Sequence, residues 1–149
     1  MIILKSGLLF NTSDFFHIYT HLCLCNSLFT PALSTVVDIK EYSKKLSTKA
    51  TRFEYWNSNN LVGLIAAYEN YESSFLYITN VSIIPAFQGK GLARKLLSEC
   101  IALSRRCGFN NILLEVNKKN LGAINLYVSF GFSYESEKNN LQTMNLILK

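Results

Sequence analysis

Long apolar runs, prolines and acidic residues are all scarce in this sequence of 149 residues. No apolar stretch approaches the roughly 18 residues that a membrane-spanning helix needs, so neither such a helix nor a membrane partner is expected. The apolar start, residues 1–10, lacks the basic segment and the small-residue cleavage site of a signal peptide. Only two prolines occur, and there is no internal repeat or low-complexity segment. A single domain over residues 1–149 with one core is therefore expected.

Cysteine pairs are also missing. The four cysteines form no Cys-x-x-Cys pair, and only two histidines occur. His17, His21, Cys23 and Cys25 are close in sequence, but on a helix only positions 17, 21 and 25 share a face. We therefore expect no metal site, and we interpret the cysteines as apolar thiols of a reducing, cytoplasmic compartment.

The net charge is modest, at +5, and the basic residues are scattered along the chain. Neither a basic tail nor a clustered basic face is evident, so a nucleic-acid partner is not expected. The small excess of positive charge would favour an anionic ligand. With 49% hydrophobic and 17% charged residues, the composition is that of a globular protein.

Hydrophobic periodicity gives a coarse order of elements. Spacings of three and four predict helices over residues 14–25, 38–50, 89–107 and 120–130. Apolar and alternating runs bounded by turn residues predict strands over 51–56, 61–70, 75–84, 110–116, 132–136 and 141–148. Two helices, an antiparallel meander and then alternating strands and helices indicate a mixed α/β domain. The last strand, if it lies at a sheet edge, would offer a surface for a homodimer.

The junction between one strand and the next helix reads Gln88-Gly89-Lys90-Gly91. Glycines at a helix start allow a phosphate to approach the free N–H groups of the backbone. Two familiar phosphate loops are absent, because no serine or threonine follows Lys90 and because Arg94 stands where a dinucleotide loop has its third glycine. The alternative is a flexible helix start without a ligand.

Two motifs in order resemble those of the GNAT superfamily of N-acetyltransferases. Residues 88–93, QGKGLA, resemble its acetyl-CoA loop, Gln/Arg-x-x-Gly-x-Gly/Ala, and the preceding VSIIP at 81–85 is similar to its central strand. Residues 114–132, LEVNKKNLGAINLYVSFGF, resemble its second motif, which runs from Leu-Glu-Val to Gly-Phe. The resemblance covers residues 61–132 well, whereas the first fifty residues match only in outline.

The resemblance implies the GNAT fold, a splayed and mostly antiparallel sheet flanked by helices. It implies that the pantetheine arm of acetyl-CoA lies in the opening of the sheet, beside a bulged central strand. Backbone N–H groups of the glycine loop would hold the pyrophosphate. The cofactor-binding residues implied in this way are Val81, Ser82, Ile83, Gln88, Gly89, Lys90, Gly91, Leu92, Ala93, Arg94, Asn120 and Tyr127.

Two residues of the second motif carry the implied chemistry. Tyr127 stands at the position of the family's tyrosine acid, whose hydroxyl donates to the departing sulfur. Glu115 aligns with a glutamate that some members use as a base, often through water. By spacing alone, Tyr127 would be a core aromatic and Glu115 a partner in an ion pair or a hydrogen bond at a strand end. The rival candidates, which flank the expected substrate mouth, are Glu69, Glu72, Tyr68 and Tyr77. His17 and His21 are weaker candidates, because a histidine near an apolar helix usually packs in the core.

The implied function is that of an acetyl-CoA-dependent N-acetyltransferase, which transfers acetyl directly to a primary amine. We expect a small-molecule acceptor, an amino sugar or a metabolite amine. An N-terminal or lysine amine of a protein is the alternative, and a non-catalytic acyl-CoA sensor is an alternative of another class. Residues 29–45 would cover one side of the acceptor pocket. The expected substrate contacts are Tyr68, Asn70, Glu72 and Tyr77.

Overall fold

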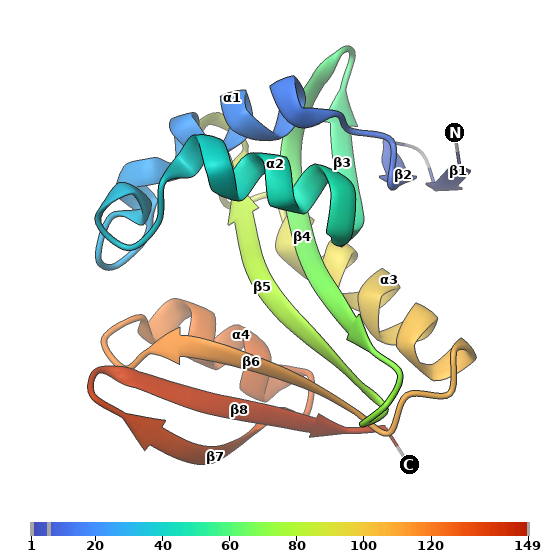
Figure 1. Cartoon of the computed structure of the whole chain (residues 1–149), viewed down its shortest axis with the longest axis vertical. Coiled ribbons are helices and arrows are strands. Elements are labelled where there is room, and N and C mark those ends of the chain that lie inside the picture. Colours follow the sequence, from blue (N-terminus) through green and yellow to red (C-terminus); the bar gives the residue numbers. More distant parts are fainter. Residues whose placement is uncertain (1, 6, 149) are drawn as a thin grey trace.

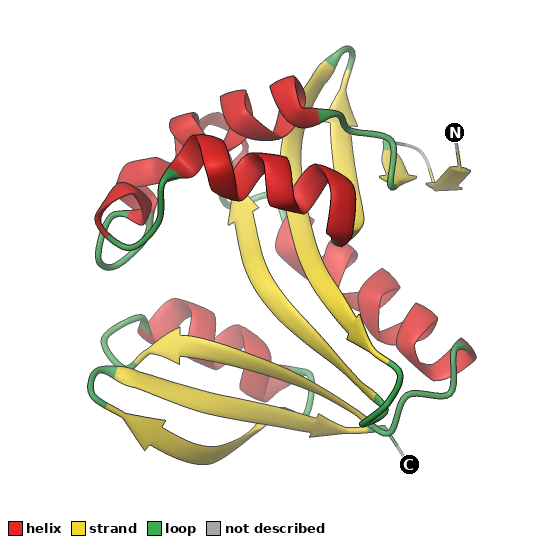
Figure 2. Cartoon of the chain, viewed as in Figure 1, coloured by secondary structure: helices red, strands yellow, loops and turns green. Residues whose placement is uncertain are grey.

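The computed structural model of the protein describes residues 2–5 and 7–148, which form a mixed α/β fold. The strands of this described chain make one sheet in the order β1-β2-β3-β4-β5-β6-β8-β7. Helices α1 (Phe15–Cys25) and α2 (Ile39–Lys49) cover one face, and α3 (Leu92–Arg106) and α4 (Leu121–Ser129) cover the other (Figure 1, Figure 2). The strands are β1 (Ile2–Lys5), β2 (Leu8–Phe10), β3 (Thr51–Asn57), β4 (Asn60–Asn70), β5 (Phe75–Ile83), β6 (Asn111–Asn117), β7 (Ser133–Lys138) and β8 (Leu141–Ile147).

All four predicted helices are present, and polar caps set where three of them, α1, α2 and α4, begin, whereas the N-cap of α3 is Gly91. Asp14 accepts a hydrogen bond from His17 N (2.9 Å) at the start of α1. Asp38 does the same with Glu41 N (3.0 Å) at the start of α2. These bonds satisfy N–H groups that the first turn of a helix leaves unpaired. None of the described helices is long and apolar enough to cross a membrane.

The first two strands were not predicted, because residues 1–10 show no alternation long enough to mark a hairpin. β2 is three residues long and is held by its neighbour β3, with Leu9 opposite Glu54. The last strand does not meet the condition of lying at a sheet edge. β8 lies between β6 and β7, so β7 is the outer strand.

Strand β5 carries a bulge that changes which of its side chains face α3. Ala66 of β4 pairs with Asn80 and Ala67 pairs with Ile78, which leaves Thr79 without a partner in β4. Before the bulge, Ile78 packs into the core beside α3, whereas after it Val81 and Ile83 do so. One extra residue shifts the alternation by one position and bends the strand.

Beyond the bulge, β5 and β6 separate. These parallel strands pair only from Phe75 opposite Asn111 to Ile78 opposite Leu114. From there β5 continues to Ile83 toward α1, while β6 continues to Asn117 beside β8. The sheet therefore opens into a V, as Figure 1 shows, which confirms the expected splayed fold.

One buried core spans both halves of the V, and a second lies within the half that carries α1 and α2. Leu96 and Leu97 of α3 pack with Ile65, Leu76 and Ile112 in the larger core. A second core joins α1 and α2 to the opposite face of β4. Its buried members are Ile18, Leu22, Leu33, Leu46, Ala50, Leu61, Leu64 and Ala66.

A buried carboxylate, Glu54 on β3, organises the start of α1. Its side chain is fully buried and accepts hydrogen bonds from Thr12 N (3.0 Å), Thr12 Oγ1 (2.7 Å) and Trp56 Nε1 (3.1 Å). Ser13 N (3.0 Å) and the Ser13 hydroxyl also donate to it. Burial alone would raise the pKa of Glu54, but the hydrogen bonds from Ser13, Thr12 and Trp56 hold it below its usual value.

The partner of this carboxylate is Arg52, two residues earlier on the same face of β3. Its Nε lies 3.3 Å from Glu54 Oε2. The guanidinium also donates to the carbonyl oxygens of Leu46 (3.1 Å), Ala50 (3.1 Å) and Ser13 (2.8 Å). The pair therefore ties the end of α2 and the start of α1 to the sheet.

Replacing Glu54 by glutamine should lower the free energy of unfolding by about 3 kcal/mol, because it leaves the buried Arg52 charge unpaired. A carboxyl with a lowered folded-state pKa contributes stability above its unfolded pKa of about 4.3, and this contribution is lost as the pH falls through the lower folded value. Urea unfolding between neutral and acid pH measures both effects. The free energy of unfolding of wild type should fall in that acid range. For Glu54→Gln, the free energy of unfolding should change less steeply with pH.

The matched control is Glu41→Gln, which removes an exposed carboxylate 3.6 Å from Lys44. Its effect should stay below about 1 kcal/mol, as for most surface ion pairs. Equal unfolding midpoints for Glu54→Gln and wild type would show that the buried pair does not hold the helices in place.

Candidate active site

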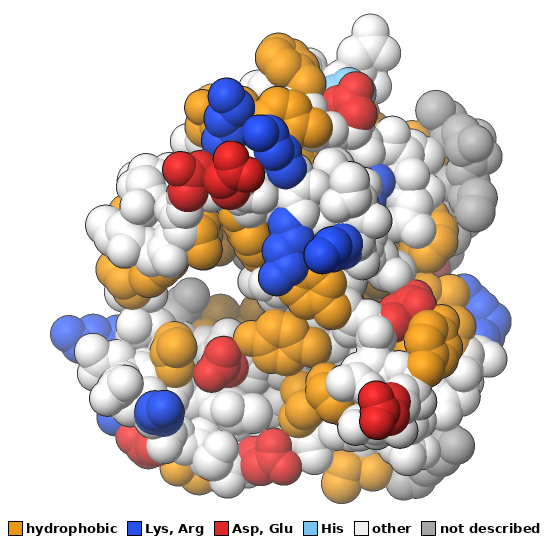
Figure 3. All heavy atoms as spheres, viewed as in Figure 1, with side chains coloured by type: hydrophobic (Ala, Val, Ile, Leu, Met, Phe, Trp, Pro, Cys, Tyr) orange, Lys and Arg blue, Asp and Glu red, His pale blue; other side chains and the backbone are white. Residues whose placement is uncertain are grey.

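The opening between β5 and β6 is a cleft of about 640 Å³. One wall comes from β5 and the other from the end of β6 and from α4, while residues 28–37 and Tyr42 close it on the side of α1 and α2. Figure 3 shows the hollow between the half that carries these two helices and the half that carries β6 to β8. Nine of the predicted site residues line it: Tyr77, Val81, Ser82, Ile83, Gln88, Ala93, Glu115, Asn120 and Tyr127.

The glycine loop joins β5 to α3 at one end of the cleft. Gly89 and Gly91 have φ values of +76° and +75°, which L side chains rarely adopt. A Cβ at either position would meet nothing within 4 Å. Glycine is therefore required by the backbone conformation, and not by a lack of room for a side chain. Gln88 Nε2 donates to Ile83 O (2.7 Å) and fixes the loop to the end of β5, while the buried Leu92 anchors it below.

This loop presents a run of free donors. No hydrogen bond within the described chain uses the backbone N–H groups of residues 89–94. They lie at the positive end of the α3 dipole, beside two left-handed glycines, in a geometry that favours an anion. The Lys90 side chain is exposed, whereas Arg94 reaches α4, where Nη2 donates to Ser129 Oγ (3.1 Å). The Arg94 guanidinium also lies 5.5 Å from the centre of the Phe130 ring.

The wall of the cleft formed by β5 has an unpaired edge. Past Ile78, no described residue of β6 pairs with β5. Tyr42 Oη donates to Thr79 O (3.1 Å) and Gln88 Nε2 to Ile83 O, so the main chain between these two carbonyls is the part of the edge that can bind an extended ligand as an added strand would. Val81 and Ile83 turn toward α3, whereas Ser82 turns toward α1 and its Oγ lies 2.8 Å from His21 Nε2.

Neither histidine is available as a base in the cleft. His21 is buried, and its Nδ1 lies 3.0 Å from Leu61 O. That carbonyl requires a proton on Nδ1, and burial lowers the pKa of His21 to about 4, so the ring is neutral. His17 caps α1 through Asp14 and packs its ring edge against Trp56, outside the lining of the cleft.

Tyr127, on α4, lines the cleft with only 6% of its surface exposed. Its ring packs against Phe132, with centroids 5.7 Å apart. Burial raises the pKa of Tyr127 to about 12. The raised pKa keeps the hydroxyl protonated, and since it makes no hydrogen bond to any other described residue, it is free to donate one to a ligand in the cleft.

Glu115 lies on β6 one residue beyond the last pair with β5, at the point where the strands separate. Tyr77 of β5 donates its hydroxyl hydrogen bond to Glu115 Oε1 (3.0 Å) across this point. Burial, with the hydrogen bond and charge of Glu115, raises the pKa of Tyr77. Among the described residues, Glu115 Oε2 has no partner, and the side chain is exposed to the cleft.

Asn120 is the N-cap of α4, where its Oδ1 accepts from Ala123 N (3.2 Å). This role fixes the side chain at the rim and leaves its amide hydrogens for a ligand. The sequence did not single out Asn80, Asn117, Leu126 or Leu141, which also line the cleft. Leu126 could have been identified from helical spacing, since it lies three residues after Ala123 on the same helix face.

Three of the predicted substrate residues lie elsewhere. Glu72 is in the exposed turn between β4 and β5, and Asn70 accepts from Ser73 N (2.8 Å) at the end of β4. Tyr68 packs against the second core, with the Lys45 ammonium 5.0 Å from its ring centre and its buried hydroxyl unpaired. Only Tyr77 of the four lines the cleft. Asn70 and Glu72 therefore have no geometric support as substrate contacts.

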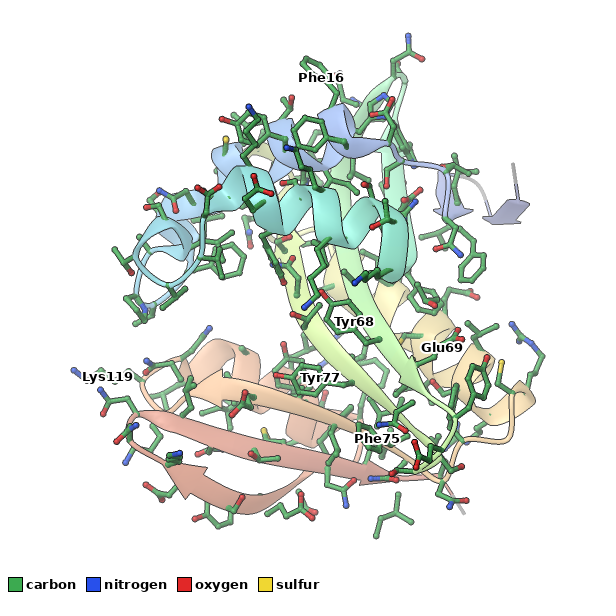
Figure 4. All side chains as sticks on the ribbon, in the orientation of Figure 1. Phe16, Tyr68, Glu69, Phe75, Tyr77 and Lys119 are labelled. Atoms are coloured by element: carbon green, nitrogen blue, oxygen red, sulfur yellow. The ribbon has the colours of Figure 1, made fainter. Side chains whose placement is uncertain are left out.

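The rival base Glu69 is already engaged. It accepts from Thr51 Oγ1 (2.8 Å) and Tyr71 Oη (2.6 Å). Figure 4 shows Glu69 near the closed end of the V, whereas Tyr68 and Tyr77 lie below α2.

No cysteine lines the cleft. Burial raises the pKa of Cys25 and Cys100 to about 12, and Cys23 and Cys107 are exposed on the surface. Within the part of the chain that the structure describes, no three His, Cys, Asp or Glu side chains converge as a metal site needs.

Comparison with known proteins places the chain in a family. The sequence profile of the acetyltransferase (GNAT) family matches residues 18–132. An L-methionine sulfoximine/L-methionine sulfone acetyltransferase of Salmonella typhimurium is 36% identical over 83 residues, 53% of this chain and 48% of that protein. A ribosomal protein bS18-alanine N-acetyltransferase of Haemophilus ducreyi is 29% identical over 96 residues, 64% of this chain and 65% of that protein. The chain thus spans less than two-thirds of the length of either relative.

Solved structures share the fold. The Salmonella typhimurium protein yncA, solved with its cofactor acetyl-CoA, has a TM-score of 0.72 at 21% identity, over 96% of this chain and 95% of that one. The ribosomal-protein-S18-alanine N-acetyltransferase of Escherichia coli has a TM-score of 0.73 at 18% identity, over 95% and 94%. The family profile covers most of the chain, including the glycine loop and the helix that carries Tyr127. The chain belongs to the acetyltransferase (GNAT) family.

Proposed function

We propose that this protein is an acetyl-CoA-dependent N-acetyltransferase that transfers acetyl directly to the primary amine of a small molecule. One observation carries the proposal. A single cleft holds the strand edge, Tyr127 and the carboxylate of Glu115, and the glycine loop adjoins it: Gln88 and Ala93 line the cleft, whereas residues 89–92 and 94 lie just outside its lining.

The residues of the cleft fit acetyl-CoA. The N–H groups of residues 89–94 would hold its pyrophosphate, and the edge of residues 79–83 would pair with its extended amide arm. Asn120 would donate from its side-chain amide. When bound there, the cofactor supplies an acetyl group activated as a thioester.

The acceptor amine must lose a proton. A lysine-like amine with a pKa near 10.4 is only about 1/2500 neutral at pH 7, which corresponds to roughly 4.6 kcal/mol. An α-amine with a pKa near 7.7–8.0 is already about 10–20% neutral, so it needs a base less. Glu115 Oε2 would accept the proton, directly or through water, while Tyr77 keeps the other carboxylate oxygen in place.

Tyr127 would act as the acid. Because burial raises its pKa to about 12, the phenol stays protonated at physiological pH and donates to the leaving sulfur. No thiol of the described chain lines the cleft, which favours direct transfer over an acyl-cysteine intermediate.

The proposal has two versions, in which the acceptor is either a small-molecule amine or a protein N-terminus. The relatives named above acetylate a small amino-acid derivative in one case and a protein alanine in the other. The cleft is lined largely by apolar side chains, which favours a metabolite amine over an amino sugar. A protein N-terminus is the second candidate.

The first test is calorimetric titration of the protein with acetyl-CoA. Gly91→Glu should weaken binding at least about 100-fold, because its carboxylate would repel the pyrophosphate at the helix start. Gly108→Glu is the matched control, since Gly108 also has a positive φ (+79°) and open space, but at the other end of α3. An equal loss of acetyl-CoA affinity in both variants would mean that backbone strain, and not repulsion of the pyrophosphate, causes the loss. If wild type does not bind acetyl-CoA, the cofactor is removed from the proposal.

The second test is Tyr127→Phe. Its kcat should fall by about 100-fold, the lower range for loss of an acid, while the free energy of unfolding changes by less than about 0.5 kcal/mol, because the hydroxyl has no partner in the protein. Thiol release from acetyl-CoA and urea unfolding measure the two quantities. Full turnover by Tyr127→Phe would exclude this residue as the acid. If wild type binds acetyl-CoA but acetylates no amine, the alternative of a non-catalytic acyl-CoA sensor would be favoured.

A further inference from the structure

The cleft contains very little charge. Among the described residues that line it, Glu115 is the only side chain with a formal charge, and no lysine, arginine or histidine is present. The other polar groups of the lining are neutral hydroxyls and amides. The cleft therefore presents one negative charge and no cation to an acceptor.

The cations around the cleft are engaged elsewhere or lie outside its lining. The Lys45 ammonium lies over the Tyr68 ring, and Lys118 Nζ pairs with Glu137 Oε2 at 2.6 Å. Arg94 is held against α4 by Ser129. Lysine and arginine appear on the outer surface in Figure 3, on both sides of the hollow.

The lips of the cleft are apolar. Leu28 and Val36, from the segment between α1 and α2, are 45% and 62% exposed, and Leu141 at the start of β8 is 40% exposed. All three line the cleft, as do Phe29 and Leu126. Apolar side chains at this exposure gain stability when a ligand covers them.

These features discriminate between amines. An ammonium group would be attracted by Glu115, and an apolar substituent would fit between the lips. A carboxylate on the carbon next to the nitrogen would lie near Glu115 without a cation to pair with, and like charges brought together in a partly dehydrated site cost several kcal/mol. A free amino acid is therefore a poor acceptor on electrostatic grounds.

We propose that the acceptor is a small primary amine with an apolar substituent and no carboxylate next to the nitrogen. This inference rests on the proposed acetyltransferase function and narrows its substrate class. A free amine is favoured over a peptide N-terminus, because each peptide unit brings an N–H and a C=O, while Leu28, Val36 and Leu141 offer them no hydrogen bond.

The test compares 2-phenylethylamine, L-phenylalanine and L-phenylalaninamide as acceptors with saturating acetyl-CoA. They differ only in the group on the carbon next to the nitrogen, which is hydrogen, carboxylate or amide. The value of kcat/KM, expressed per concentration of neutral amine, should be at least about 100-fold higher for 2-phenylethylamine than for L-phenylalanine. A ratio near one, or a preference for L-phenylalanine, would overturn the inference.

Two further outcomes have distinct meanings. An amide preferred over 2-phenylethylamine by the same margin would make the acceptor a peptide N-terminus and overturn the assignment to a small amine. If none of the three is acetylated although acetyl-CoA binds and Gly91→Glu abolishes binding, the inference is wrong while cofactor binding stands. If acetyl-CoA does not bind, the proposed function itself fails.

A charge introduced at the lip tests the electrostatic cause. Val36→Arg places a guanidinium beside the cleft at an exposed position, and Val36→Gln is the neutral control. The arginine variant should raise kcat/KM for L-phenylalanine relative to 2-phenylethylamine about fivefold, as expected for an exposed ion pair, and the glutamine variant should not. Equal ratios in both variants would show that the missing cation does not exclude the carboxylate.

Discussion

The short pairing between β5 and β6 is the constraint on which the site depends. Four residue pairs hold these parallel strands together, and the bulge at Thr79 turns β5 away immediately afterwards. A longer pairing would close the sheet and remove the cleft. The cost of the opening is a set of unpaired backbone groups, which a ligand with its own amide groups can satisfy. The same divergence separates Glu115 from β5 and leaves one of its oxygens free.

The two halves of the V share the larger core but differ in what else holds them. On one side, Arg52 and Glu54 bind the ends of α1 and α2 to β3. On the other, β6, β8 and β7 form an antiparallel unit covered by α4. The hydrogen bond between Tyr77 and Glu115 joins the halves where they separate, so the residues proposed for proton transfer also lie at the joint.

The sequence predicted the helices well, because each has an apolar stripe and three of them begin at a polar cap such as Asp14 or Asp38. The loop at 88–91 was also predictable, since left-handed backbone at a helix start requires glycine. The position of the bulge was not, because Thr79 is unpaired only relative to β4, and register depends on both strands. Tyr68 and Tyr77 illustrate a second limit. Both are aromatic residues on adjacent strands, yet only the second reaches the cleft. The lack of cations in the lining could not be predicted either, because it depends on where every basic residue points.

In the proposed function the loop at the start of α3 would bind through its main chain, and this has a consequence for how the protein can change over evolutionary time. Every residue type except proline supplies the same N–H group, so substitutions at exposed positions such as Lys90 and Arg94 leave the donors in place. Only Gly89 and Gly91 are restricted by their conformation. Selection for the proposed cofactor would therefore act on these two glycines and on Gln88 and Leu92, which hold the loop in place, while the walls that face the acceptor could change. Such a division allows one ancestral chain to give rise to enzymes with the same donor and different acceptors.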